Sequence, residues 1–339
     1  MPLPPPISVV IPAFNAAAHI DAALASVADQ RGGFPLEILV VDDGSIDDTG
    51  ARVAAFALAA KARGSPHEVP NRSVTGTVDG HGPVTVRLIT QPNAGPAAAR
   101  NRGIRAASGD LIAFLDADDR WPADRLRVQL AILADHPQVG LVFGDCRGFD
   151  AQGERALTQF EADGLDLGFW GDPVLVADPY GKLLRNNFIP TGAVLARKGA
   201  LLAAGLFDES RRLVEDLDLW LRLALNCPMA YTRDVCECKR IHGANLSADR
   251  DAMALAYIEV LRAQAATVPG ELRRRALRIA PLIAFEYCLI GARREDRGDR
   301  AGARNAFAAA LWSAPALRPL YYWLRTWRPR RRRPPQVRS

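Results

Sequence analysis

The stretch Gly109–Asp119 reads GDLIAFLDADD, an apolar run that leads directly into three carboxylates. A second stretch, Leu36–Thr49, reads LEILVVDDGSIDDT and follows the same plan, with an apolar run that ends at Asp42 and Asp43. Continuous apolar runs of this length are typical of strands buried on both faces of a parallel sheet. Ligands of open α/β sheets bind outside the carboxyl ends of such strands. The two acid clusters are therefore expected to lie on neighbouring strand ends and to form one ligand site.

Around these two stretches, strand-like apolar runs alternate with helical patterns over the first 145 residues. Strands are predicted at 7–11, 36–41, 84–89, 111–115 and 139–143, and helices at 19–30, 96–107, 122–134 and in the segment ending near 62. This alternation predicts an α/β fold with a mostly parallel sheet and helices on both faces. Gly, Pro and polar residues dominate 63–83, which we predict to be an inserted surface loop. Residues 151–187 have no clear pattern and stay unassigned.

The remaining part of the chain is predicted to be mainly helical. A strand is expected at 192–197, and apolar residues at helical spacing predict helices at 215–225, 252–266 and 272–294. We therefore divide the chain into a main domain at 1–247, a helical extension at 248–319 and a basic tail at 320–339.

Composition and charge narrow the class of protein. The chain has 339 residues, of which 49% are hydrophobic and 24% charged, and this excludes a wholly disordered or collagen-like protein. The net charge of +5 comes from the end of the chain, because seven arginines and no acid follow from Arg325 onward. The preceding body is nearly neutral, so we do not expect it to bind nucleic acid.

The basic tail also holds aromatic residues, Tyr321, Tyr322, Trp323 and Trp327. Aromatic rings beside arginines favour contact with an anionic membrane surface. The alternatives are a solvated tail or a weak attraction to nucleic acid. The start of the chain lacks the pattern of a signal peptide, and the five cysteines lack metal-ligand spacing. We therefore expect a cytoplasmic protein, peripheral at the inner face of the cell membrane.

The acid clusters indicate a particular chemistry. Oxygen-rich side chains suit hard divalent cations, above all a cation shared with phosphates. In an extended segment, Asp116 and Asp118 project to the same side. The alternative is that these acids only form turns and cap helices. Two clusters on neighbouring strand ends make that alternative weaker.

Seven segments occur in the order and approximate spacing of known motifs. They are VVIPAFN (9–15), LVVDDGSIDDT (39–49), NAGPAAARNRG (93–103), GDLIAFLDADD (109–119), GLFDES (205–210), EDLDLWLRL (215–223) and IHGANLS (241–247). Together they resemble the family 2 glycosyltransferases of the GT-A fold, over about residues 7–247. The resemblance implies a Rossmann-like nucleotide-binding half. It also implies inverting transfer of a sugar from a nucleotide-sugar donor, with UDP favoured, to a glycan or lipid-linked acceptor.

The resemblance also implies roles for the donor-side residues. Pro12, Ala13 and Asn15 correspond to the first loop over the nucleotide, and Asp43 to the acid that accepts a hydrogen bond from the base. Arg100 is at a position that meets the base or the diphosphate, with an exposed helix arginine as the alternative.

Asp116-Ala117-Asp118 matches the DXD motif of the family. This implies that Asp116 lies near the ribose and that Asp118 binds Mn²⁺ or Mg²⁺, with the diphosphate supplying further oxygen ligands. His242 is implied to reach the diphosphate or the metal. A loop histidine bonded to the backbone is the alternative.

Glu215 and Asp216 match the catalytic acid pair, which implies that Asp216 is the general base for the acceptor hydroxyl. The alternative is that both acids only cap a helix. Two rival functions stay open. A sugar-phosphate nucleotidyltransferase would need a Gly-rich basic loop where this chain has IPAFNAAAH. A catalytically silent glycan-binding or scaffold protein would not need Asp43, Asp118 and Asp216 to be intact.

Overall fold

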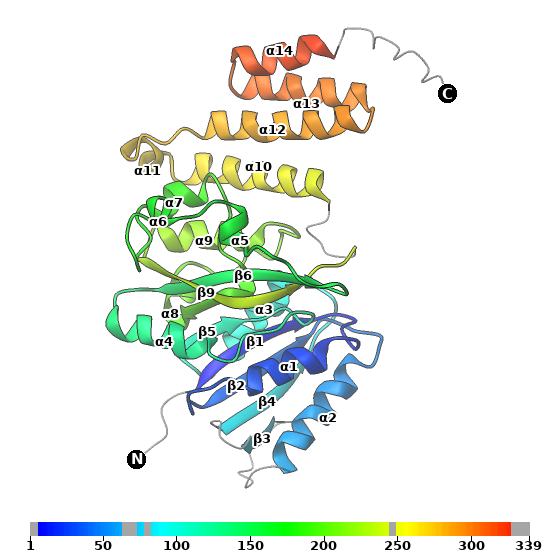
Figure 1. Ribbon diagram of the computed structural model, residues 1–339, viewed down its shortest axis with the longest axis vertical. Coiled ribbons are helices and arrows are strands. Elements are labelled where there is room, and N and C mark those ends of the chain that lie inside the picture. The colour runs from blue at the N-terminus through cyan, green and yellow to red at the C-terminus, as the bar shows by residue number, and fades with distance from the viewer. Residues whose placement is uncertain (1–5, 63–72, 78–82, 244–248, 327–339) are drawn as a thin grey trace. The chain divides into compact units, whose positions relative to one another are not determined.

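The computed structural model describes residues 6–62, 73–77, 83–243 and 249–326. The chain divides into two compact units, Met1–Asn245 and Leu246–Ser339, and each is described by itself. Figure 1 shows the first unit as a sheet covered by helices and the second as a set of helices.

A nine-stranded mixed sheet forms the frame of the first unit, with strand order β3-β4-β2-β1-β5-β8-β6-β7 and with β9 paired to β6. The central strands β4, β2, β1 and β5 run parallel to one another. Their apolar runs make them the core, since every residue of β2 and nearly every residue of β1 is buried. The predicted α/β fold with a mostly parallel sheet is confirmed. The strands of this unit are β1 (Ile7–Ala13), β2 (Leu36–Asp42), β3 (Ser73–Thr77), β4 (Pro83–Thr90), β5 (Leu111–Phe114), β6 (Leu141–Asp150), β7 (Gly153–Glu154), β8 (Val194–Arg197) and β9 (Met229–Arg240).

Helices connect the parallel strands and cover the sheet (Figure 1). Helix α1 follows β1, α2 follows β2, and α3 leads from β4 to β5, as a parallel sheet requires. Later in the chain, α9 carries the predicted acidic pair at its first two positions. The helices are α1 (Ile20–Ala28), α2 (Thr49–Ala62), α3 (Pro96–Ala106), α4 (Arg125–Asp135), α8 (Lys198–Ala203) and α9 (Glu215–Ala224), with a 3₁₀ turn at Thr191–Ala193.

The strand order corrects one prediction about the acid clusters. Strand β1 lies between β2 and β5, so the clusters that follow β2 and β5 are not on adjacent strands. The end of β1 at Ala13 separates them, and the chain from there to Asn15 runs between the two clusters along the same sheet edge.

The predicted insertion at 63–83 is not a loop throughout. Residues Ser73–Thr77 form β3, which pairs antiparallel with β4 and extends the sheet by one edge strand. Two further parts of the predicted loop, 63–72 and 78–82, lie outside the described residues. Alternating polar and small residues in a Gly-rich context hid this strand from sequence patterns.

The segment without a pattern folds into short elements, namely β7, α5 (Gln159–Ala162), α6 (Leu167–Trp170) and α7 (Pro179–Leu183). None of these helices is long enough to show a helical period, which explains why the sequence did not predict them. Their apolar side chains instead join one aromatic cluster, in which Trp170 stacks on Tyr231 with 4.3 Å between ring centroids. Phe143, Phe160, Phe169 and Phe188 belong to the same cluster.

The described part of the second unit, residues 249–326, holds the helices α10 (Arg250–Thr267), α11 (Pro269–Arg274), α12 (Ile279–Asp296), α13 (Arg300–Ser313) and α14 (Leu317–Arg325). The helix predicted at 272–294 is broken, because α11 ends at Arg274 and Ala276 has a positive φ of 52°. Helices α12 and α13 approach closely at Gly291, where a Cβ would lie 2.5 Å from the Phe307 ring. Among the described residues, no helix is long and apolar enough to span a membrane.

The predicted tail begins inside a helix. Leu320 and the next five residues belong to α14, and Tyr322 stacks on Phe307 with 5.4 Å between ring centroids. Residues 327–339, with most of the arginines of the predicted tail, lie outside the described residues.

Candidate functional site

The acid pair after β2 organises the turn in front of α3. Asp43 is buried, and its Oδ1 accepts hydrogen bonds from Gln91 Nε2 at 2.7 Å and from the Ala94 amide at 2.9 Å. Its Oδ2 accepts one from the Gly95 amide at 2.8 Å. Asp42 Oδ1 accepts from the Ser45 amide at 2.9 Å and closes the turn after the strand. Asp43 therefore holds the start of α3 against the carboxyl end of β2.

The loop after β1 is joined to the same turn. Asn15 has a positive φ of 50°, its amide donates to Ser45 Oγ at 2.9 Å, and its Oδ1 accepts from the Ile46 amide at 3.0 Å. The Asp43 amide donates to the Ala13 carbonyl at 2.8 Å. Pro12 lies in β1 beside Val41 of β2. Sequence reasoning placed Pro12, Ala13, Asn15 and Asp43 at one site, and the structure brings them together.

The segment Asp116–Asp119 forms a turn in which the Asp119 amide donates to the Asp116 carbonyl at 3.1 Å. The expectation that Asp116 and Asp118 project to the same side of an extended segment is therefore wrong. Ala117 between them is buried in the main apolar core. The turn sends the two carboxylates toward different partners, Arg100 and His242.

Arg100 joins the DXD turn to helix α9. Its guanidinium donates to Asp116 Oδ1 and to Glu215 Oε1, each at 2.7 Å, and only 6% of its side chain is exposed. The alternative of an exposed helix arginine is therefore wrong. Burial by itself would lower the pKa of Arg100. The carboxylates of Asp116 and Glu215 outweigh burial and raise the pKa above its usual value, so the guanidinium stays charged. Burial raises the pKa of Asp116, but Arg100 and Lys239 outweigh it and hold the pKa below its usual range.

The second DXD acid contacts the predicted histidine. His242 Nε2 lies 3.0 Å from Asp118 Oδ2, and both side chains are partly exposed. Asp118 and His242 come from segments far apart in the sequence, so their meeting distinguishes this histidine from one bonded to backbone only. Across the described ranges, no group of three or more His, Cys, Asp or Glu side chains is arranged to hold a metal ion. A metal bound by Asp118 would need its other ligands from the diphosphate or from water.

The two acids at the start of α9 also have different partners, as do those of the DXD turn. Glu215 is buried against Arg100, while Asp216 is half-buried and points elsewhere. Asp216 Oδ2 accepts hydrogen bonds from Asn187 Nδ2 and Thr191 Oγ1, each at 3.2 Å. Burial raises the pKa of Glu215, in spite of Arg100. Both acids bond to side chains outside the helix, so neither serves only as a helix cap.

Sequence reasoning missed a buried charge cluster below the DXD turn. Asp119, Glu237 and Lys239 are close to one another, and Asp119 Oδ1 accepts from the Arg240 amide at 2.6 Å. Burial, together with the neighbouring Glu237, raises the pKa of Asp119 to about 10. Glu237 and Lys239 are two positions apart in β9, so their side chains lie on the same face of the strand, and this spacing was the signal for them. Asn187 and Thr191 were also missed, since they lie in or beside the segment without a pattern.

Comparison with known proteins decides the family. The family model described as glycosyl transferase family 2 matches residues 8–185, more than half of the chain. The chain belongs to glycosyltransferase family 2. The pre-mycofactocin glycosyltransferase of Mycobacterium tuberculosis is 35% identical over 41% of this chain and 28% of its own length. The UDP-Glc:alpha-D-GlcNAc-diphosphoundecaprenol beta-1,3-glucosyltransferase WfgD of Escherichia coli is 30% identical over 41% of this chain and 45% of its own.

A solved structure shows the fold over a longer range. The mannosyltransferase PcManGT from Pyrobaculum calidifontis, solved in complex with GDP-Man and Mn²⁺, matches with a TM-score of 0.59 and 19% identity, over 95% of this chain and 79% of its own. At this identity the likeness establishes the GT-A fold. The family 2 chain spans less than half the length of the two curated relatives named above.

Proposed function

We propose that this chain is an inverting glycosyltransferase that moves a sugar from a nucleotide-sugar donor to an acceptor hydroxyl. The observation that carries the proposal is that Arg100 binds one acid of each pair and not the other. This arginine binds Asp116 and Glu215 and leaves Asp118 and Asp216 for other partners. A donor diphosphate needs a metal-binding acid and an acceptor needs a base, and the two remaining carboxylates supply one of each.

The donor side would bind the nucleotide along the loop Pro12–Asn15 and the turn fixed by Asp43. Asp43 Oδ2 accepts a single hydrogen bond within the described residues, so it retains a lone pair for a base N–H. Asp118, with His242 beside it, would hold Mn²⁺ or Mg²⁺ on the diphosphate. The carboxylate oxygen of Asp118 fits such a cation, and the diphosphate or water would supply the remaining oxygen ligands. When bound, the metal supplies charge neutralisation at the leaving diphosphate.

On the acceptor side, Asp216 would take the proton of the attacking hydroxyl. The acceptor oxygen then bonds to the anomeric carbon as the bond from that carbon to the diphosphate oxygen breaks, and the configuration inverts. Asn187 and Thr191 each donate to Asp216 Oδ2 and would hold the carboxylate in one orientation. Glu215 would not act as a base, because Arg100 occupies it in the core.

UDP is the favoured nucleotide, and a glycan or lipid-linked sugar is the favoured acceptor. The support is WfgD, whose name gives UDP-Glc as donor and a diphosphoundecaprenol-linked sugar as acceptor. PcManGT, with GDP-Man, keeps a GDP-sugar as the alternative donor and supports a dependence on divalent metal.

A donor screen tests the proposal. The full chain is incubated with UDP-, GDP- and dTDP-sugars, with Mn²⁺, with Mg²⁺ or with EDTA, and the released nucleotide and the transfer to lipid-linked and free glycans are measured. We expect turnover of one UDP-sugar that EDTA abolishes. Nucleotide binding without turnover of any donor would instead favour a catalytically silent glycan-binding or scaffold protein. Pyrophosphate release from a nucleoside triphosphate and a sugar phosphate would favour a nucleotidyltransferase.

A further inference from the structure

The last described helix, α14, presents an apolar stripe to solvent. Leu317, Leu320, Tyr321 and Leu324 follow the spacing i, i+3, i+4 and i+7, which places them on one face of a helix. Leu317 is 85% exposed, Tyr321 60% and Leu324 51%. A soluble helix normally turns such a stripe inward. The described residues therefore leave this stripe uncovered.

The inward face of α14 is already used for packing, so the stripe is not available to the fold. Pro319 is buried, Tyr322 stacks on Phe307, and Arg300 donates to the Thr326 carbonyl at 2.6 Å. These contacts anchor the helix from the side opposite to the stripe, since residues 319 and 322 lie on the other face. Of the stripe, Tyr321 touches this packing through an edge contact with Tyr322, at 5.6 Å between ring centroids.

Positive charge borders the stripe. Arg318 and Arg325 lie seven residues apart on one flank of the stripe, and Arg325 pairs with Glu295. Arg318 is exposed, and the recorded contact of its guanidinium is the ring of Tyr322 at 5.8 Å, with no ion pair among the described residues. Five more arginines follow between positions 328 and 333 in the sequence. An apolar stripe with a cationic flank matches the chemistry of an anionic bilayer surface.

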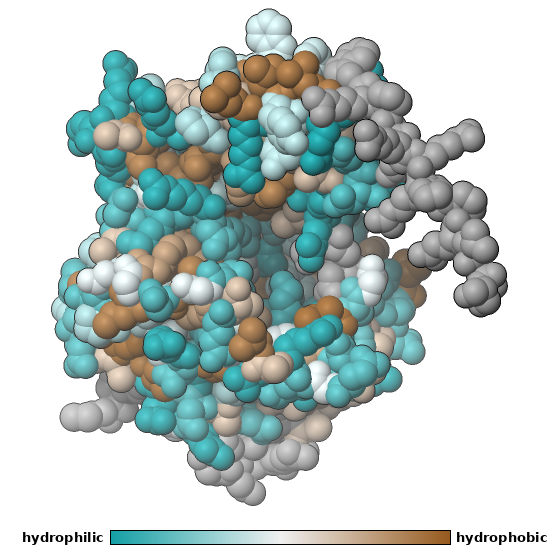
Figure 2. Space-filling model, turned by 45° about the horizontal axis from the view of Figure 1, so that its top comes forward, coloured by the Kyte–Doolittle hydropathy of each residue, from teal (hydrophilic) through white to brown (hydrophobic). Residues whose placement is uncertain are grey.

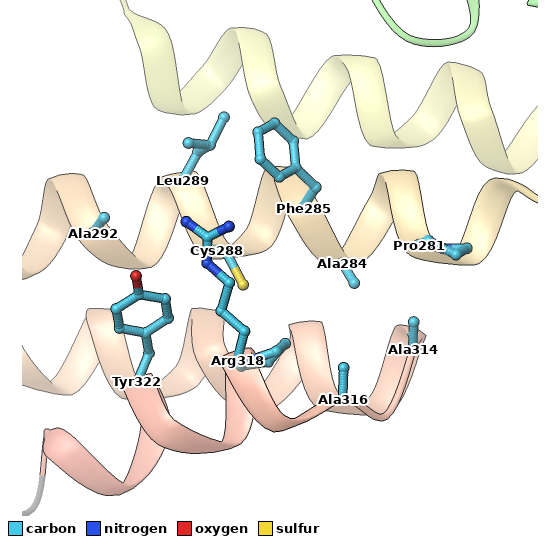
Figure 3. A pocket seen from close by; sticks show the side chains of 11 residues that line it. Pro281, Ala284, Phe285, Cys288, Leu289, Ala292, Ala314, Ala316, Arg318 and Tyr322 are labelled. Atoms are coloured by element: carbon cyan, nitrogen blue, oxygen red, sulfur yellow. The ribbon is translucent and has the colours of Figure 1, made fainter.

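A groove of about 270 Å³ continues the apolar surface on the flank of Arg318. It lies between α12 and α14, and Figure 3 shows Phe285, Leu289, Arg318 and Tyr322 around it. Phe285 is 52% exposed there. Trp312, at the end of α13, is 90% exposed, and hydrophobic side chains are visible on the helical unit at the top of Figure 2. Exposed aromatic rings are favoured at the headgroup level of a membrane.

We propose that α14 docks in the surface of an anionic lipid bilayer, with the stripe Leu317–Leu324 in the acyl boundary and Arg318 at the headgroups. The occupant is lipid rather than protein, because the stripe combines apolar side chains, aromatic rings and positive charge without acidic residues along α14. The helix lies in the interface and does not cross it, since α14 has 9 residues. This inference does not rest on the proposed transfer reaction.

Vesicle sedimentation of the full chain tests the docking. The vesicles contain phosphatidylcholine alone, or phosphatidylcholine with about 30% phosphatidylglycerol. We expect binding to the anionic vesicles only, and weaker binding as salt rises, because salt screens the arginines. Equal binding to both vesicles, or binding to neither, would overturn the proposal.

Two variants and a control locate the surface. The triple variant Leu317→Gln, Tyr321→Gln, Leu324→Gln should bind anionic vesicles at least about tenfold more weakly. Arg318→Gln should weaken binding about fivefold and covers the case in which the triple variant does not fold. Leu58→Gln removes one 63% exposed leucine from α2 and should bind like the parent.

Undiminished binding of both the triple variant and Arg318→Gln would overturn the assignment to α14. So would loss of binding in Leu58→Gln. Analytical ultracentrifugation tests whether a second copy of the chain binds the stripe. A dimer of the parent protein that is absent in the triple variant would refute the lipid proposal.

Discussion

The turn after β5 and the start of α9 each present two acids, and the molecule treats the two pairs alike. In each pair one carboxylate is held by Arg100 at 2.7 Å, Asp116 in the turn and Glu215 in the helix. The other carboxylate, Asp118 or Asp216, has neutral or titratable partners and reaches solvent. The two acids of each pair therefore have different surroundings, because Arg100 binds only one of them.

The largest effect is expected when the open acid of α9 is changed. Asp216→Asn keeps the size of the side chain and removes the base, so transfer should fall by about 10²–10⁴-fold while UDP affinity and melting temperature stay near those of the parent. Initial rates with the best donor, isothermal calorimetry and thermal melting measure the three quantities.

The control is Asp218→Asn on the same helix. Asp218 pairs with Arg222 at 2.7 Å, so its loss should lower the melting temperature and leave most of the turnover. If Asp216→Asn retains more than about a tenth of the parent rate, Asp216 is not the base.

Replacement of Arg100, the cation that both pairs share, should destabilise the fold. Arg100→Met leaves Asp116 and Glu215 without their buried counter-charge, and loss of one partner of a buried ion pair costs about 3–5 kcal/mol of unfolding free energy. Urea unfolding measures this loss. Arg105→Met is the matched control in α3, because Arg105 is exposed and pairs with Glu209 at 3.5 Å. If the unfolding free energy of Arg100→Met falls by less than about 1 kcal/mol, as expected for a surface ion pair, then Arg100 does not stabilise the fold through Asp116 and Glu215.

The open acid of the DXD turn should control the metal rather than the fold. Calorimetry of the parent with UDP should show an affinity that EDTA lowers, and Asp118→Ala should bind at least about tenfold more weakly and respond little to metal. Asp124→Ala, at an exposed acid paired with Arg31, serves as the control. Metal-dependent affinity that persists at the parent value in Asp118→Ala would refute this role.

The smallest effect is expected at the held acid of α9. Glu215→Gln keeps an oxygen that can accept from Arg100 but removes the charge, so turnover should stay within about tenfold of the parent and stability should fall by about 1–3 kcal/mol. Rate and melting measurements on this variant and on Asp216→Asn form the direct comparison. A larger rate loss in Glu215→Gln than in Asp216→Asn would reverse the roles of the two acids.

The sequence predicted the half of the site that depends on local pattern. Strands β1, β2 and β5 were predicted because their apolar runs are continuous, and the acids at their ends followed from strand direction. The sharing of Arg100 by Asp116 and Glu215 was not predicted, because side-chain pairing between distant segments leaves no period in the sequence.

The same limit applies to the remaining parts. The short helices between 159 and 183 are shorter than the windows in which a helical period is visible. The cluster of Asp119, Glu237 and Lys239 depends on how β9 approaches the DXD turn, and only the fold supplies that approach. Local pattern thus predicts the strands, the helices and the acids that follow them, while tertiary contacts decide which partner each acid has.

The bridge made by Arg100 also sets an order of assembly during synthesis. Asp116 follows Arg100 by 16 residues, whereas Glu215 follows it by 115. At a ribosomal rate of about 5–20 residues per second, the emerging chain waits roughly 6–23 seconds between Arg100 and Glu215. During that interval the nascent nucleotide-binding half holds its arginine with one counter-charge only. Under the proposed function, the acceptor side would be the last part of the site to form, and a chain interrupted before α9 would lack Asp216, the proposed base.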